Sequence, residues 1–168
     1  MATALACLCE RPTPLLFESG CYRVRLAPAV VQKAATLARH RAPLETGGML
    51  LGVVVEGEAL VLAVTGPGRR VARGRVAFQA DREHDNRLLR RVYPRLRYLG
   101  DWHTHPGGPA ELSRTDVASV RESLSPRQPE VLHMLLAGPA GMDEGVRVAL
   151  FTAVRGEADV RRMAEGSR

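Results

Sequence analysis

The chain has 168 residues, a length typical of one domain, and its 45% hydrophobic content suffices for a core. Its net charge is +6, but the arginines are scattered and no recognition motif accompanies them, which disfavours a nucleic-acid partner. The apolar runs are too short to cross a membrane and the first ten residues lack a basic signal-peptide start, so we expect a cytoplasmic protein.

Hydrophobic patterning predicts strands and helices in alternation along most of the chain. Apolar residues at helical spacing follow Pro28, and proline is favoured at the first position of a helix. Alternating or continuous apolar runs between Gly and Pro turns predict strands. In chain order we expect a strand at 22–26, a helix at 28–40, strands at 49–55 and 59–65 joined by a tight turn at 56–57, a strand at 75–79, a helix at 81–93, a strand at 98–105, a helix at 113–124, and strands at 131–137 and 146–154.

Both ends of the chain are predicted to lie outside the folded domain. Residues 1–20 contain Pro12 and Pro14 and are expected to form an irregular lead-in. Residues 156–168 are expected to be a charged tail that forms a frayed helix. Between them, residues 21–155 predict one α+β domain, with a mixed central sheet flanked by helices.

The stretch Asp101-Trp-His103-Thr-His105-Pro is the most informative part of the sequence. Histidines at i and i+2 on a strand point to the same face, so both imidazoles can approach one metal ion at ~2.0–2.1 Å. Asp116 follows a short loop rich in Gly and Pro, in the first turn of the next helix, and is a reachable third ligand. The three residues predict a zinc site with an open position for water.

A second interpretation of this region needs no metal. Ser113 and Asp116 also fit a capping box at a helix start, where an aspartate is favoured by the helix dipole. The two interpretations are compatible, because Ser113 can cap the helix while its hydroxyl faces the site. The other histidines, His40, His84 and His133, are predicted to have structural roles.

Three separate motifs occur in a defined order. The chain carries Glu45-Thr-Gly-Gly-Met-Leu-Leu-Gly52, then His103-Thr-His105-Pro106, then Ser113-Arg-Thr-Asp116. Together they resemble the signature of the JAMM (MPN+) zinc metallopeptidases, with every signature position filled. The resemblance covers roughly residues 22–154 and implies a cytidine-deaminase-like fold.

The resemblance implies a role for each signature residue. One zinc ion would be held by His103, His105 and Asp116, with water as the fourth ligand. Glu45 would take a proton from that water and return it to the leaving amine. Zinc and the Ser113 hydroxyl would stabilise the oxyanion.

The family hydrolyses peptide or isopeptide bonds after the C-terminal glycine of ubiquitin-like proteins, and some members process sulfur-carrier proteins. Residues 66–68, 78–81 and 98–108 resemble the small bacterial subgroup found in anti-phage and ubiquitin-like conjugation operons. The resemblance therefore implies deconjugation or precursor processing. Sulfur-carrier maturation and a catalytically silent MPN scaffold are the alternatives, and the sequence leaves the oligomeric state open.

An extended glycine-rich substrate tail suits a narrow groove in which it is held by strand addition. The segment 66–79 is the candidate wall of that groove, and its arginines could meet acidic patches on a partner. The predicted substrate-binding residues are Gly66, Arg69, Arg70, Arg73 and Arg75.

Overall fold

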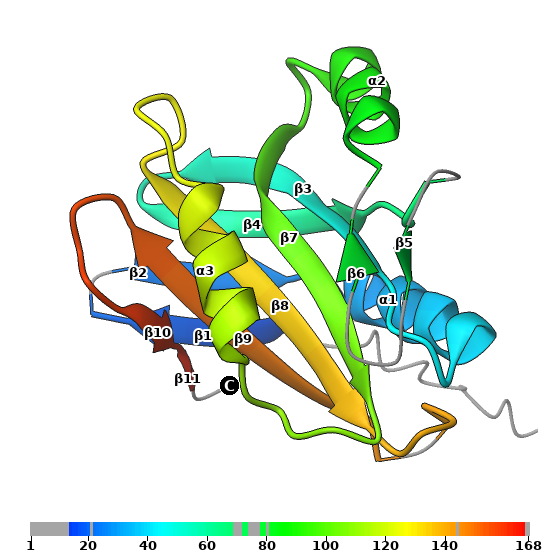
Figure 1. Cartoon of the computed structure of the whole chain (residues 1–168). Coiled ribbons are helices and arrows are strands. Elements are labelled where there is room, and N and C mark those ends of the chain that lie inside the picture. The colour runs from blue at the N-terminus through cyan, green and yellow to red at the C-terminus, as the bar shows by residue number, and fades with distance from the viewer. Residues whose placement is uncertain are drawn as a thin grey trace, which may run out of the picture.

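A computed structural model of the chain describes residues 14–20, 22–68, 72–73, 78–79, 81–143 and 145–166 (Figure 1). The helices are α1 (Pro28–Arg41), α2 (Arg82–Val92) and α3 (Arg114–Glu122). The strands are β1 (Leu15–Ser19), β2 (Tyr22–Leu26), β3 (Gly47–Val55), β4 (Glu58–Val64), β5 (Ala72–Arg73), β6 (Phe78–Gln79), β7 (Arg97–Pro106), β8 (Glu130–Gly138), β9 (Arg147–Val154), β10 (Val160–Arg162) and β11 (Ala164–Glu165). None of these helices is long and apolar enough to cross a membrane.

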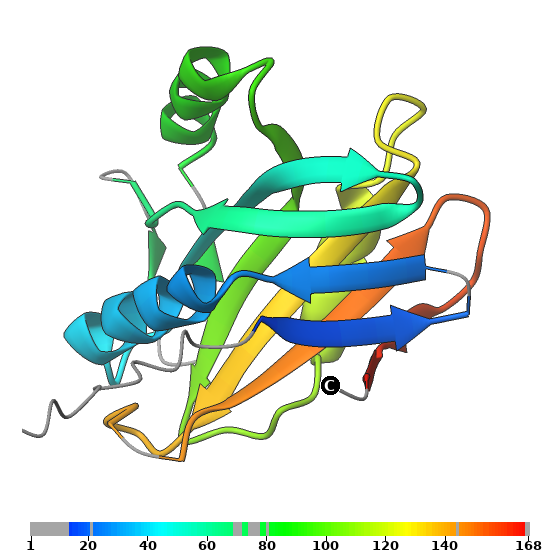
Figure 2. The same cartoon turned by 180° about the vertical axis from the view of Figure 1, so that it is seen from behind.

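Nine strands form one mixed sheet in the order β10-β9-β8-β7-β3-β4-β2-β1-β11. The pairs β2/β4 and β7/β8 are parallel and the other neighbours are antiparallel, which confirms the predicted α+β class. The two edge strands, β10 and β11, are separated in sequence only by Met163. Because Arg162 and Ala164 are two Cα–Cα steps apart, at most about 7 Å, the two edges come together and the sheet is nearly closed (Figure 2).

The strands β7 and β8 divide their side chains between two layers. Trp102 and Met134 enter the large core, which α1 completes with residues such as Ala34. Val131, on the opposite face of β8, packs with Val120 of α3. Figure 1 shows α3 across β8 and β9, and Figure 2 shows α1 on the other side of the sheet. Residues adjacent to Trp102 along β7 therefore face the α3 side.

The structure confirms the predicted helix starts at Pro28 and Asp81 and the predicted turn at 56–57. Pro28 occupies the first turn of α1, and the Asp81 side chain accepts a hydrogen bond from the His84 amide at 3.0 Å at the start of α2. Glu56 and Gly57, with φ of 50° and 81°, turn β3 into β4. Two consecutive residues with positive φ match the twist of a two-residue hairpin.

The predictions for both ends of the chain are wrong in part. Within the predicted lead-in at 1–20, residues 15–19 form β1, paired along its length with β2, and Phe17 is buried. The prolines precede this strand and leave its backbone free to pair. Within 156–168 the expected frayed helix is replaced by β10, paired with β9, and β11, paired with β1. Edge strands keep one face in water, so their charged side chains concealed the strand pattern.

Candidate metal centre

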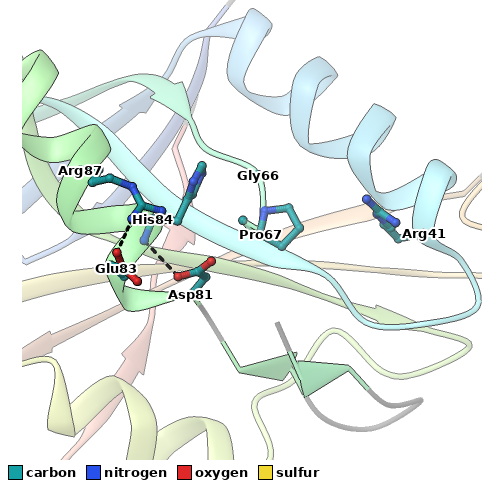
Figure 3. Close-up of a pocket in the computed structure, with 8 residues that line it drawn as sticks. Arg41, Gly66, Pro67, Asp81, Glu83, His84 and Arg87 are labelled. Atoms are coloured by element: carbon teal, nitrogen blue, oxygen red, sulfur yellow. Dashed lines mark hydrogen bonds and ion pairs between the residues drawn. The ribbon is translucent and has the colours of Figure 1, made fainter. Parts of the chain in front are cut away.

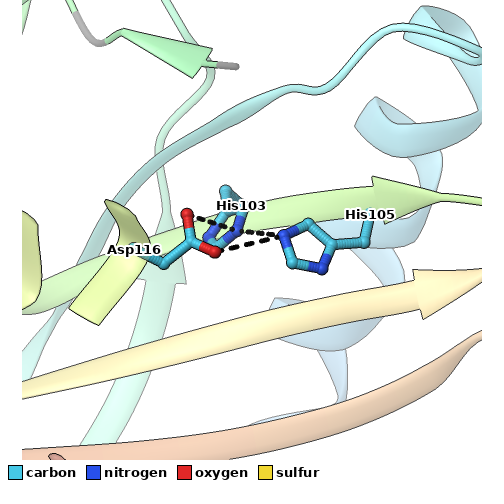
Figure 4. A group of neighbouring side chains, drawn as sticks. All are labelled: His103, His105 and Asp116. Atoms are coloured by element: carbon cyan, nitrogen blue, oxygen red, sulfur yellow. Dashed lines mark hydrogen bonds and ion pairs between the residues drawn. The ribbon is translucent and has the colours of Figure 1, made fainter. Parts of the chain in front are cut away.

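His103 and His105 lie near the end of β7, on the face opposite Trp102, and their Nε2 atoms are 2.9 Å apart. Asp116, in the first turn of α3, points its carboxylate at both rings (Figure 4). Asp116 Oδ1 is 3.5 Å from His103 Nε2, and Oδ2 is 3.4 Å from His105 Nε2. In a tetrahedral zinc site with bonds of ~2.0–2.1 Å, ligand atoms lie roughly 3.3 Å apart. The three side chains fit such an ion.

The start of α3 fixes the Asp116 carboxylate. The Ser113 amide donates to Asp116 Oδ2 at 2.7 Å, and the Asp116 amide donates to Ser113 Oγ at 3.2 Å, so the predicted capping box is confirmed. Burial raises the pKa of Asp116, but hydrogen bonds from His105 and Ser113 outweigh burial and hold it well below its ordinary value. The carboxylate is therefore ionised at neutral pH, as a metal ligand must be.

The loop after β7 orients the His105 ring. His105 Nδ1 lies 3.1 Å from the Pro109 carbonyl oxygen, which can only accept, so Nδ1 carries the hydrogen. Nε2 is then the atom that faces His103 and Asp116. The pKa of His105 is raised, chiefly by its hydrogen bond to Asp116, so a proton and a metal ion compete for the same nitrogen.

The His103 ring is buried and has a different partner. Burial lowers the pKa of His103 to about 4, so the imidazole is neutral at pH 7 and able to bind a metal. His103 Nδ1 lies 2.6 Å from Nε2 of His133, on the neighbouring strand β8. The sequence predicted only a structural role for His133. Its alternation within β8 was visible, but the pairing of β8 with β7, which brings the rings together, was not.

Glu45 lines the same cavity as His103, Ser113 and Asp116. Its position follows from the adjacent backbone, since the Thr46 carbonyl accepts from the Thr104 amide at 2.9 Å and the Thr46 amide donates to Thr104 Oγ1 at 3.0 Å. The residue is 7% exposed. Burial raises the pKa of Glu45 to about 7. The carboxyl can therefore both take up and release a proton at neutral pH.

The glycines after Glu45 allow close packing beneath the site. A Cβ at Gly48 would lie 2.4 Å from the Thr65 carbonyl oxygen, so this position requires glycine. Thr65 Oγ1 accepts from the Met49 amide at 2.8 Å, and its carbonyl accepts from Trp102 Nε1 at 3.0 Å. These contacts tie β3 to β7 behind the metal-binding face.

The cavity holds about 550 Å³ and extends from the metal centre along β7 toward α2. At its far end Asp101 accepts from the Tyr98 hydroxyl at 2.7 Å, and burial raises the pKa of Asp101 to about 6. The wall toward α2 and α3 is mainly polar, formed by Arg82, Asp85, Asn86, Leu89, Ser119, Val120, Glu122 and Ser123. The cavity beside the metal centre therefore offers many hydrogen-bonding side chains.

Residues 27–153 match a family model described as prokaryotic homologs of the JAB domain. The chain belongs to this family. The match confirms the family expected from the three motifs, and this JAB protein is a hydrolase of the JAMM type.

Named relatives agree with this assignment. A CD-NTase/cGAS isopeptidase from Enterobacter hormaechei is 29% identical over 152 residues, which cover 86% of this chain and 82% of the relative. A probable metalloprotease, y4qB, from Sinorhizobium fredii is 32% identical over 105 residues, covering 56% of this chain and 63% of the relative. The names place peptidase or isopeptidase activity in the family.

Two solved structures share the fold of this JAB protein. One, from Desulfitobacterium hafniense, superposes with a TM-score of 0.63 at 17% identity and covers 81% of this chain and 88% of its own. The other, from Salinibacter ruber, has a TM-score of 0.52 at 19% identity, with coverages of 84% and 97%. At these identities the likeness concerns the fold alone.

Two of the predicted substrate-binding residues, Gly66 and Arg73, lie among the described residues, and the role of all five stays a prediction. Gly66 lines another cavity, with Pro67 and residues of α1 and α2 (Figure 3). Arg73 belongs to β5, whose backbone pairs with β6, the described end of the strand predicted at 75–79. The remaining predicted residues, Arg69, Arg70 and Arg75, lie outside the described residues.

Proposed function

We propose that this JAB protein is a zinc-dependent peptidase that cleaves after the C-terminal glycine of a ubiquitin-like protein, in a conjugate or a precursor. The observation that carries the proposal is the convergence of His103, His105 and Asp116, two of which, His103 and Asp116, line the same cavity as Glu45. The Enterobacter hormaechei relative, named an isopeptidase, supports the class of bond.

The ligand set would be His103, His105 and Asp116. Zinc bound there supplies a Lewis acid that polarises the scissile carbonyl and acidifies water. The chemistry of the donors supports zinc, which favours two imidazoles and one carboxylate in catalytic sites.

Glu45 moves the proton during hydrolysis. Its carboxylate takes a proton from the attacking water, whose oxygen bonds to the carbonyl carbon, and it delivers that proton to the nitrogen as the C–N bond breaks. Burial raises the pKa of the Glu45 carboxyl, which makes its carboxylate a stronger base for the first of these transfers. Because Ser113 Oγ accepts from the Asp116 amide, its hydroxyl hydrogen remains available to the carbonyl oxygen of the substrate.

The substrate tail would lie against the segment 66–79. The short sheet of β5 and β6 has two strands and thus two edges at which a tail could add. Reversing charge at Arg69, Arg70 and Arg73 to Glu should weaken turnover while zinc content stays unchanged. Equal turnover would remove this segment from the proposal.

The test of the function uses ubiquitin-like proteins that end in Gly-Gly, joined to a reporter by a peptide bond or to a lysine by an isopeptide bond. Zinc-loaded chain should cleave after the glycine, a chelator should stop the reaction, and added zinc should restore it. Glu45→Ala should lose at least ~100-fold in rate and keep its zinc. Glu111→Ala, which removes the same charge from the exposed loop between β7 and α3, is the matched control.

The outcomes separate the candidates. Cleavage of a sulfur-carrier precursor alone would select carrier maturation over deconjugation. Zinc-loaded protein that leaves every glycine-ended substrate intact would sink the proposal, and a chain that binds no zinc would favour the scaffold.

A further inference from the structure

We propose that His133 is a positioning residue, which holds the His103 imidazole in the orientation and tautomer that leave Nε2 for the metal. This inference rests on the proposed function, because it assigns His133 a role toward the same zinc ion. His133 belongs to none of the three signature motifs.

The sheet brings the two rings together. β8 runs parallel to β7 with His133 in register with Asp101, and both His103 and His133 project toward the α3 side. The ring centroids are 4.8 Å apart and the ring planes are inclined by 58°. His133 Nε2 lies 2.6 Å from His103 Nδ1, a hydrogen-bond distance.

The two nitrogens of His103 therefore have separate tasks. Nε2 faces His105 Nε2 at 2.9 Å and Asp116 Oδ1 at 3.5 Å, whereas Nδ1 faces Nε2 of His133 at 2.6 Å. A buried ring with a fixed partner on one nitrogen cannot rotate without breaking that bond. His133 thereby fixes the direction of the nitrogen that would bind zinc.

The position of the hydrogen decides whether zinc can bind. One hydrogen occupies the bond between the two neutral rings. If His133 donates it, the hydrogen of His103 sits on Nε2 and blocks the metal. If His103 Nδ1 donates it, Nε2 keeps its lone pair and His133 carries its own hydrogen on Nδ1. Only the second arrangement, in which His133 is the acceptor, would leave His103 Nε2 able to hold zinc. The Pro109 carbonyl has the same effect on His105, because it accepts from Nδ1 and so leaves Nε2 without the hydrogen.

The experiment compares two replacements of His133 that differ in their ability to accept a hydrogen bond. His133→Gln keeps a side-chain oxygen that can accept from His103 Nδ1, and His133→Phe keeps a ring without an acceptor. The zinc dissociation constant is measured by competition with a chromogenic chelator, and the Co²⁺-loaded proteins are compared by visible absorption. His40→Phe, at an exposed position at the end of α1, is the control.

We expect His133→Phe to weaken zinc binding 10- to 100-fold and to change the Co²⁺ spectrum. His133→Gln should recover most of the affinity, and His40→Phe should match the wild type. If His133 had only a structural role, the polar Gln would be the worse replacement at this buried site. The His133→Gln variant would then have the lower thermal stability, and neither variant would lose zinc selectively. A His133→Phe variant with the zinc dissociation constant of the wild type would overturn the proposal.

The readout also separates this inference from the proposed function. Wild-type chain that binds zinc but cleaves no substrate would refute the peptidase, while the ranking of Gln above Phe in zinc affinity would still support His133. Wild-type chain that binds no zinc would overturn both.

Discussion

Replacement of Glu45 by glutamine should abolish cleavage and stabilise the metal-free protein at alkaline pH. Burial raises the pKa of Glu45 from 4.5 to about 7, so the folded chain disfavours the ionised carboxylate. At 1.36 kcal/mol per pKa unit the full shift is worth roughly 3 kcal/mol. Water in the open cavity screens the charge, and we expect about 1–2 kcal/mol to be measured.

Glu45 links protonation to folding because its pKa differs between the folded and the unfolded chain. Between about pH 4.5 and 7 the unfolded carboxyl is ionised while the folded one keeps its proton, so the contribution of Glu45 to stability falls as pH rises and levels off above about 7. Glutamine cannot ionise, so Glu45→Gln lacks this decline. The variant should match the wild type near pH 4.5 and exceed it by about 1–2 kcal/mol near pH 8.

Urea denaturation with a chelator present, across this pH range, measures the difference. The chelator is needed because a bound cation would favour the carboxylate and mask the effect. Glu111→Gln, on an exposed loop, should keep the wild-type pH dependence. A Glu45→Gln profile parallel to the wild type would refute the account of this buried acid.

Three further predictions concern the supports of the site. Gly48→Ala should lower stability by about 2 kcal/mol or more, because the added methyl would overlap the Thr65 carbonyl, and thermal melting measures the loss. Ser113→Ala should lower the free energy of unfolding by about 1 kcal/mol, because the helix cap is lost. It should also slow cleavage under conditions in which the variant is fully folded. A rate equal to that of the wild type would remove the hydroxyl from the mechanism. Zinc affinity should fall as pH drops from about 8 to 6, because the raised pKa of His105 makes protons compete for Nε2, and chelator competition at each pH would show a flat profile if this were wrong.

Local patterns predicted much of the metal centre. The i, i+2 spacing of His103 and His105 places both rings on one face of a strand whatever the tertiary structure, and the capping box around Asp116 is encoded within four residues. The position of Glu45 came from resemblance to a family, because no local rule brings residue 45 beside residue 105.

The features that could not be predicted from the sequence depend on pairing between strands that are far apart in the chain. His133 reads as one polar residue in an apolar strand, and only the register of β8 against β7 reveals its partner. The strands β10 and β11 are short and charged, and they exist because the opposite edges of a curled sheet supply their partners. The likeness to the cytidine-deaminase fold stays a prediction.

The proposed mechanism requires one zinc ion among His103, His105 and Asp116. A crystal structure of the zinc-loaded protein, with anomalous data collected on both sides of the zinc edge, tests it directly. We expect a single anomalous peak at ~2.0–2.2 Å from His103 Nε2, His105 Nε2 and an Asp116 carboxylate oxygen, with the Glu45 carboxyl facing the ion without binding it. A peak elsewhere, or no peak in zinc-saturated crystals, would contradict the account.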